Sequence, residues 1–195
     1  MSDQLSSLYG LVLAGGQSRR MGIDKGQINY HGVPQREYIG GLLQQVGCAK
    51  VYWSLAETPE QSTPFPVLID TFADVGPIAG LYAAFAHHPN VAWLVVACDF
   101  PLLGMETLHF LLHHRRSDLD ATAFKNEHHD FPEPLLTIYE PSTQLLLEKS
   151  KQQQQYSLKR LLLEARTQLL VPPSFQSLLN VNTPDLAKKI RDELQ

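Results

Sequence analysis

Seven consecutive residues near the middle of the chain, 91–97 (VAWLVVA), are all apolar. A short run of this kind, rich in β-branched and aromatic residues, predicts a β-strand rather than a helix. No polar side chain alternates with the apolar ones, so both faces of the strand are expected to be buried. Such strands occur almost only in parallel sheets that carry helices on both faces.

The rest of the chain agrees with such a sheet, because short β-branched or aromatic runs alternate with longer amphipathic stretches. The predicted fold class is α/β: a three-layer, mostly parallel sheet with helices on both faces. At 195 residues the chain has the size of one domain, and we expect a single domain over residues 1–195. The expected strands are 9–14, 50–56, 65–69, 91–97, 121–124, 135–139 and 168–171, and the expected helices are 34–46, 77–87, 106–116, 141–149, 157–165 and 184–194.

The charges are distributed unevenly, although the net charge is only −4. Residues 1–36 carry four basic and two acidic groups, whereas residues 37–114 carry seven acidic groups and a single basic one, Lys50. A broad nucleic-acid surface, which needs many phosphate contacts, is therefore not expected. A local anion site within the first 36 residues is compatible with this layout.

Other classes are excluded by composition and by the first residues. There is no apolar run of about 18 residues, and the start MSDQLSSLYG lacks a basic region followed by an apolar one. We therefore expect no membrane span and no secretory signal. Two cysteines do not form a disulfide framework in a chain of this size, so a cytoplasmic location is expected.

The first predicted strand leads into a glycine-rich loop, LAGGQSRRMGIDK, at residues 13–25. Gly15 and Gly16 let the backbone approach a ligand closely and turn N–H groups toward an anion. The loop is neither a Walker A motif, which needs GK[ST], nor GxGxxG. We interpret it as a phosphate-binding loop; the alternative is that the glycines only permit a tight exit from the strand. Three basic side chains follow the glycines: Arg19, Arg20 and Lys25.

Aspartates follow two other predicted strands. Asp70 comes directly after strand 65–69, and Asp99 lies just beyond strand 91–97. Ligands of open parallel sheets bind beyond the carboxyl ends of the strands, so Gly15, Asp70 and Asp99 are expected to face one crevice. A carboxylate there can bind Mg²⁺, which takes its other ligands from water and substrate phosphates. Either aspartate could instead cap a helix or form a turn.

Two of the eight histidines have a spacing that could serve a metal. His109 and His113 are four residues apart on a predicted helix and could share one face. The sequence places no third ligand beside them, so we interpret them as part of a solvated helix face.

Several motifs, in order along residues 8–190, resemble the molybdenum cofactor guanylyltransferases. The resemblance implies a Rossmann-like nucleotidyltransferase fold and a Mg²⁺-dependent transfer of GMP from GTP to molybdenum-loaded molybdopterin, with release of pyrophosphate. GTP and molybdopterin would be substrates, Mg²⁺ the cofactor, and proteins of cofactor biosynthesis or acceptor proteins the partners; no nucleic acid or membrane partner is expected. The motifs are LAGGQSRRMG followed by Asp24-Lys25, Asp70 before GPIAG, CDFP at 98–101, PLLTIY at 134–139 and NVNTP at 180–184.

The resemblance also implies roles for single residues. Asp99 would bind the metal, and Lys25 would contact phosphates. Arg20 completes the expected catalytic group because of its place in the basic loop, where it would hold phosphates with the loop N–H groups. Asn180 and Asn182 are expected near the pterin or the metal. The expected GTP-binding residues are Leu13, Ala14, Gly15, Gly16, Lys25, Ser54, Asp70 and Asp99. Ser54 departs from the family, which commonly has asparagine at this position.

Three other functions remain open at the level of sequence. The chain could be a molybdopterin cytidylyltransferase or a sugar-phosphate nucleotidyltransferase, which share the general motif. It could also be a nucleotide-binding cofactor carrier without turnover. The occurrence of Lys25, Asp70 and Asp99 together favours an enzyme over a carrier.

Overall fold

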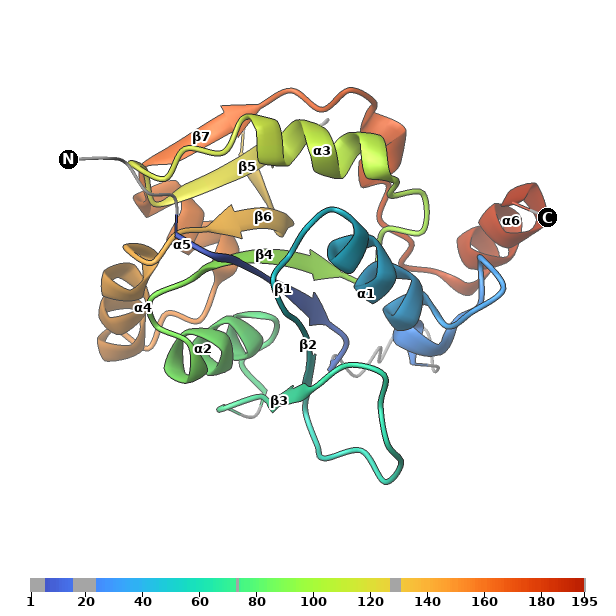
Figure 1. Cartoon of the computed structure of the whole chain (residues 1–195), viewed down its shortest axis with the longest axis horizontal. Helices are drawn as coiled ribbons and strands as arrows, with labels where there is room; N and C mark the ends of the chain where they lie inside the picture. Colours follow the sequence, from blue (N-terminus) through green and yellow to red (C-terminus); the bar gives the residue numbers. More distant parts are fainter. Residues whose placement is uncertain (1–5, 16–23, 73, 127–130, 195) are drawn as a thin grey trace.

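The core of the molecule is a sheet of seven strands in the order β3-β2-β1-β4-β6-β5-β7 (Figure 1). The computed structural model describes residues 6–15, 24–72, 74–126 and 131–194. The strands are β1 (Leu8–Leu13), β2 (Val51–Leu55), β3 (Val67–Ile69), β4 (Ala92–Ala97), β5 (Ala121–Lys125), β6 (Pro132–Tyr139) and β7 (Thr167–Leu170).

Most neighbouring strands run parallel, as the sequence predicts. Strands β3, β2, β1 and β4 are mutually parallel, and β5 pairs parallel with β7. Strand β6 runs antiparallel to both of its neighbours, β4 and β5. Since Trp93 pairs with Tyr139 and Val96 with Leu136, the first residues of β6 lie at the edge where β4 ends. The beginning of β6 therefore shares an edge of the sheet with the carboxyl ends of β1 and β4.

Helices cover both faces of the sheet, which confirms the expected layers (Figure 1). Alternate side chains of β4 enter different cores: Leu94 and Val96 face one helical layer, and Trp93 and Val95 face the other. The first layer contains α1 (Gln35–Gln45) and α3 (Met105–His113), and the second contains α2 (Ile78–His87), α4 (Thr143–Gln152) and α5 (Leu158–Glu164).

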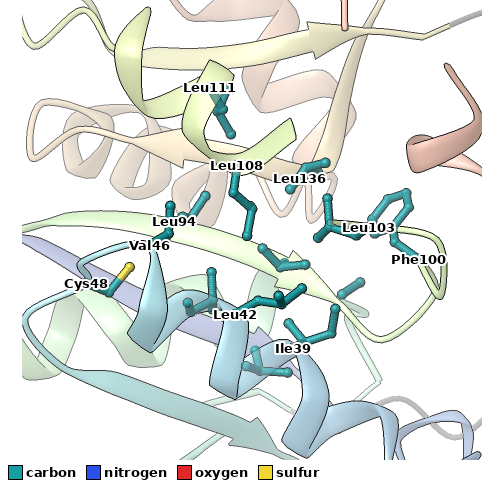
Figure 2. Packing of buried hydrophobic residues seen from close by; sticks show 14 of the residues in the cluster. Ile39, Leu42, Val46, Cys48, Leu94, Phe100, Leu103, Leu108, Leu111 and Leu136 are labelled. Atoms are coloured by element: carbon teal, nitrogen blue, oxygen red, sulfur yellow. The ribbon is translucent and has the colours of Figure 1, made fainter. Parts of the chain in front are cut away.

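The first core shows how two helices are held against the central strands. Figure 2 shows α1 and α3 converging over β4 and β6, with apolar side chains between them. Complete burial of one such leucine or isoleucine stabilises the fold by about 1.5–3 kcal/mol. The labelled side chains are Ile39 and Leu42 from α1, Val46 directly after α1, Leu108 and Leu111 from α3, Leu94, Leu136, Cys48, Phe100 and Leu103.

Several element boundaries differ from those expected. Strand β6 begins at Pro132, three residues before the expected start at 135. The apolar pattern of the sequence placed the start too late because Glu133 interrupts it, although this glutamate is buried in the strand. Two short 3-10 helices, η1 (Lys25–Gln27) and η2 (Phe175–Leu178), were not expected. Helix α1 ends as expected before Gly47, whose φ of +100° lies in the left-handed region that favours glycine.

The last helix, α6 (Pro184–Leu194), lies at the end of the molecule rather than over either face of the sheet (Figure 1). Its residues Ala187 and Ile190 form a small third core with Ile28 and Tyr30, the segment that follows η1. Val181, just before the helix, completes this core. The carboxyl-terminal segment is thus fixed beside the first loop of the chain.

Among the helices in the part of the chain that the structure describes, none is long and apolar enough to cross a membrane.

Candidate active site

Lys25 and Asp99 form an ion pair at the carboxyl edge of the sheet. Lys25 Nζ lies 3.1 Å from Asp99 Oδ2, and the two side chains are 17% and 21% exposed. Asp24 caps η1 by accepting a hydrogen bond from the Gly26 N–H at 2.9 Å, and Arg36 of α1 pairs with the Asp24 carboxylate. This cap fixes the backbone from which Lys25 extends. The loop before α1 and the end of β4 thus bring opposite charges to one point.

The carboxyl-terminal segment reaches the same point. Lys25 Nζ donates a hydrogen bond to Asn182 Oδ1 at 2.6 Å. One residue earlier, the Val181 N–H donates to the backbone oxygen of Asp99 at 2.9 Å. Asn182 is therefore brought to the Lys25–Asp99 pair, although 157 positions separate it from Lys25.

Glu133 is a buried residue of this region that the sequence did not single out. It is 5% exposed and lies at the start of β6. Its carboxylate accepts a hydrogen bond from the Leu135 N–H at 3.1 Å. Burial raises the pKa of Glu133 above its ordinary value, the polar groups of Leu135, Asn126 and Asn180 lower it, and the charge of Asp99 raises it further. The sequence signal for such a site is an acidic residue directly before an apolar strand.

A second group of residues lies where β2 and β3 end. Ser54 Oγ donates a hydrogen bond to Asp70 Oδ1 at 2.5 Å. Burial raises the pKa of Asp70, and the hydrogen bond from Ser54 lowers it. Gly80 of α2 packs directly on this pair, since a Cβ atom at that position would lie 2.3 Å from Ser54 Oγ and 2.7 Å from Leu13 Cδ2.

The first residues of the predicted phosphate-binding loop lie between these two groups. Ala14 N–H donates to the backbone oxygen of Ser54 at 3.0 Å. A Cβ atom on Gly15 would lie 2.7 Å from the backbone nitrogen of Ala56, so only glycine permits this close approach. Gly16 and Arg20 lie outside the described residues.

The expected crevice is therefore elongated. Asp70 follows β3 and Asp99 follows β4, and three steps between neighbouring strands separate them in the order β3-β2-β1-β4. At about 4.8 Å per step, the two ends of the site lie about 14 Å apart along the edge of the sheet. One end offers a hydroxyl and a carboxylate, and the other offers a lysine, a carboxylate and amides. An elongated ligand with a polar group at one end and negative charge at the other fits this arrangement.

The oxygen atoms around Asp99 suit a hard cation that takes the rest of its ligands from water and from a substrate. In the described part of the chain, no three or more His, Cys, Asp or Glu residues form a metal-binding group. Mg²⁺ does not need such a cage, because it binds one or two carboxylates and takes water and phosphate oxygens for the rest. The carboxylate of Asp99 and the amide oxygen of Asn182 are ligands of the required type. His109 and His113 both lie on α3, within the helix that the sequence predicts.

The fold and the site define an α/β protein whose candidate site lies beyond the carboxyl ends of its parallel strands, where proteins with open sheets of this kind bind their ligands. Residues 10–169 match the family model of the MobA-like NTP transferase domain, and the chain belongs to this family.

Named relatives agree with this assignment. The chain is 38% identical over 181 residues to a molybdenum cofactor biosynthesis bifunctional protein of Synechocystis sp., covering 91% of this chain and 52% of the relative. It thus spans about half the length of that relative. It is 29% identical over 198 residues to a probable molybdenum cofactor guanylyltransferase of Trichormus variabilis, covering 97% of this chain and 93% of the relative.

A solved structure agrees as well. Molybdopterin-guanine dinucleotide biosynthesis protein A from Archaeoglobus fulgidus superposes with a TM-score of 0.76 at 25% identity, covering 95% of this chain and 97% of that one.

Proposed function

We propose that the protein transfers GMP from Mg²⁺-bound GTP to the terminal phosphate of molybdenum-loaded molybdopterin, releasing pyrophosphate. The observation that carries this proposal is the meeting of Lys25, Asp99 and Asn182 at the carboxyl edge of the sheet. The relatives named as guanylyltransferases support guanine as the base. The partners we expect are GTP, molybdopterin, and proteins that supply or accept the cofactor.

The reaction joins two polyanions, so positioning and neutralisation of charge provide most of the rate. The attacking phosphate oxygen must lie in line with the α-phosphorus, opposite the leaving pyrophosphate. Lys25 would offset the charge that grows on the α-phosphoryl oxygens, and Arg20 with the loop N–H groups would hold the β- and γ-phosphates. No nucleophilic side chain is required.

At the other end of the site, Asp70 and Ser54 would hold the nucleoside. The strand order places Asp70 about 14 Å and Ser54 about 10 Å from Asp99, so the triphosphate would extend across Gly15, where the chain lacks a side chain. Asp99 would hold Mg²⁺, which when bound neutralises phosphate charge and fixes the phosphate geometry. In the described structure the Asp99 carboxylate is balanced by Lys25 instead.

Pyrophosphate release tests the proposal. Purified protein with Mg²⁺, GTP and molybdopterin should release pyrophosphate, and Asp99→Ala should reduce the rate at least ~100-fold because a preorganised charge is lost. Asp118→Ala is the matched control, since this exposed aspartate pairs only at the surface with Arg116. An Asp99→Ala variant with normal turnover would refute the assignment of Asp99.

Parallel reactions separate the other functions. CTP in place of GTP tests a cytidylyltransferase, and UTP with a sugar phosphate tests a sugar-phosphate nucleotidyltransferase. GTP binding without any pyrophosphate release would identify a carrier and contradict the proposal.

A further inference from the structure

The loop that follows β4 carries Asp99 and needs partners for its own backbone. Its side chains Phe100 and Leu103 are buried in the first core. The backbone oxygens of an irregular loop have no neighbouring strand to pair with, so they need other hydrogen-bond donors where water is excluded. The donors that this loop finds therefore decide where its residues lie, Asp99 among them.

Two side chains near the start of α1 donate to this loop. Gln35 Nε2 donates to the backbone oxygen of Phe100 at 3.2 Å, and His31 Nε2 donates to that of Pro101 at 2.8 Å. A backbone oxygen can only accept, so the Nε2 atom of His31 carries a proton. The ring of His31 is itself held, because it stacks on Tyr38 with 3.7 Å between the ring centroids. Two consecutive residues of the loop are thus held by one segment of the chain.

The same segment is also tied to the residues that carry Lys25. The Gln35 N–H donates to the backbone oxygen of Ile28 at 2.9 Å. Ile28 directly follows η1, the short helix that begins at Lys25. Gln35 therefore contacts the Lys25 segment through its backbone and the Asp99 loop through its side chain.

Stability alone does not explain the side chain of Gln35. It is 0% exposed, and its Oε1 atom has no hydrogen-bond partner among the residues that the structure describes. A buried acceptor without a partner costs free energy, so an apolar side chain of similar size would suit the core at least as well. The amide of Gln35 thus fixes geometry rather than adding stability.

We infer that Gln35 and His31 are positioning residues, which fix the loop after β4 relative to the Lys25 segment and thereby set the spacing of the Lys25–Asp99 ion pair. This inference deepens the proposed function and rests on it for its kinetic consequence. A further contact of the loop runs from the Val181 N–H to the Asp99 backbone oxygen, at 2.9 Å. The Val181 amide therefore reports whether the backbone of Asp99 stays in place.

Hydrogen exchange of the Val181 amide tests the inference without turnover. In the full chain without nucleotide, Gln35→Leu removes the donor and keeps a similar volume. We expect Val181 to exchange at least ~10-fold faster than in the wild type, because local opening becomes easier when a hydrogen bond is weakened. The internal reference is the Ala49 amide, which donates at 2.9 Å to the backbone oxygen of Leu8, where β1 begins. Unchanged exchange of Val181, or equal acceleration of both amides, would overturn the inference.

His31→Phe provides a second variant if Gln35→Leu does not fold. It keeps a ring that can stack on Tyr38 but removes the hydrogen bond to the backbone oxygen of Pro101. We expect it to accelerate the exchange of Val181 as well. A Val181 amide that exchanges as in the wild type would overturn the role of His31.

Matched controls remove contacts of the same kind elsewhere in the molecule. For Gln35→Leu the control is Gln144→Leu, because Gln144 Nε2 donates to the backbone oxygen of Pro141 at 3.1 Å, at the start of α4. For His31→Phe it is His114→Phe, because His114 Nδ1 contacts the backbone oxygen of Phe110 at 2.8 Å. Both controls should exchange at Val181 as the wild type does. Acceleration in a control equal to that in its partner variant would refute the inference.

The split between kcat and KM tests the kinetic consequence. Partners that orient the residues of a site typically change activity by about 10- to 100-fold, so Gln35→Leu should lower kcat to this degree. The KM for GTP should change little, because Ser54 and Asp70 keep their contact at the other end of the proposed site. Wild-type kcat in Gln35→Leu would refute the positioning role. A wild-type chain without pyrophosphate release would refute the proposed function, whereas the exchange of Val181 would still decide whether Gln35 and His31 hold the loop.

Discussion

At the scale of single residues, Gly80 controls the geometry of the Ser54–Asp70 pair. A methyl group at Gly80 would collide with Ser54 Oγ, at 2.3 Å, and with Leu13 Cδ2, at 2.7 Å. We expect Gly80→Ala to break the hydrogen bond to Asp70 and to destabilise the fold by about 1–3 kcal/mol through overpacking. Urea unfolding and the affinity for GTP, measured by calorimetry, check this.

Gly104 is the control for this substitution, because a Cβ atom there would meet no atom within 4 Å. Gly104→Ala should bind GTP as the wild type does. Wild-type GTP affinity in Gly80→Ala would show that the Ser54–Asp70 pair does not contact the nucleotide.

The raised pKa of Asp70 predicts a pH dependence of stability. Burial raises this pKa above its ordinary value of 3.8, so the folded chain holds the proton more tightly than the unfolded chain. The stability from this group is complete below pH 3.8 and is lost as the pH rises through the folded-state pKa. Since Asn cannot ionise, Asp70→Asn should gain free energy of unfolding relative to the wild type as the pH increases. Urea unfolding at acidic and at neutral pH measures this difference.

Asp118→Asn should show the opposite sign. The hydrogen bond from Arg116 lowers the pKa of Asp118, so the wild type gains stability from this group as the pH rises through the folded-state pKa toward the ordinary aspartate value of 3.8, and the gain is complete above that value. An Asp70→Asn difference that did not change with pH would contradict the buried environment of Asp70.

At the scale of elements, a buried ion pair connects three segments of the chain at the edge of the sheet where β1 begins. Glu140, which directly follows β6, is fully buried and accepts hydrogen bonds from Arg115 Nε at 2.6 Å and Arg115 Nη2 at 2.9 Å. Arg115 also donates to the backbone oxygen of Ser6, before β1, at 3.0 Å. The pair therefore connects the end of α3, the end of β6 and the start of β1.

Arg115→Ala would leave Glu140 charged and buried without this partner. Removal of one partner of a buried ion pair costs about 3–5 kcal/mol, and we expect a loss of this size in the free energy of unfolding. Chemical denaturation measures it. The neighbouring exposed residue is the control: Arg116→Ala should change stability little, because its pair with Asp118 is screened by water. Equal effects of the two substitutions would contradict the structural role of Arg115.

At the scale of the whole molecule, the carboxyl-terminal segment completes a site that the sheet only begins. Its helix α6 packs through Ala187 and Ile190 on Ile28 and Tyr30, whereas the two main cores lie on the faces of the sheet. A chain that ends at Leu179 should therefore keep its sheet but lose the contact of Asn182 with Lys25.

We expect this shortened chain to retain most of its far-ultraviolet circular dichroism. Its rate of pyrophosphate release should fall on the order of 100-fold, because small misplacements of catalytic groups have effects of this size. Lys189→Ala, on the exposed side of α6, should preserve the rate. Full activity of the shortened chain would show that the segment 180–195 does not belong to the site.

The sequence by itself determined most of the architecture. The apolar run of β4 and the alternation of strands and helices depend on local periodicity, which the chain displays directly. The same holds for Gly15, Asp70 and Asp99, because residues after buried strands of a parallel sheet must share an edge. The motif NVNTP pointed to Asn180 and Asn182, and both lie beside the first loop or β6.

Only the tertiary structure decided how these residues combine. The antiparallel direction of β6 depends on pairing between distant strands, and no local pattern reveals that it brings Glu133 to the edge where β4 ends. The Lys25–Asn182 contact likewise depends on the packing of α6 against Ile28 and Tyr30. The physical reason is that periodicity records which side chains are buried, whereas strand direction and long-range contacts depend on the free energy of the whole assembled core.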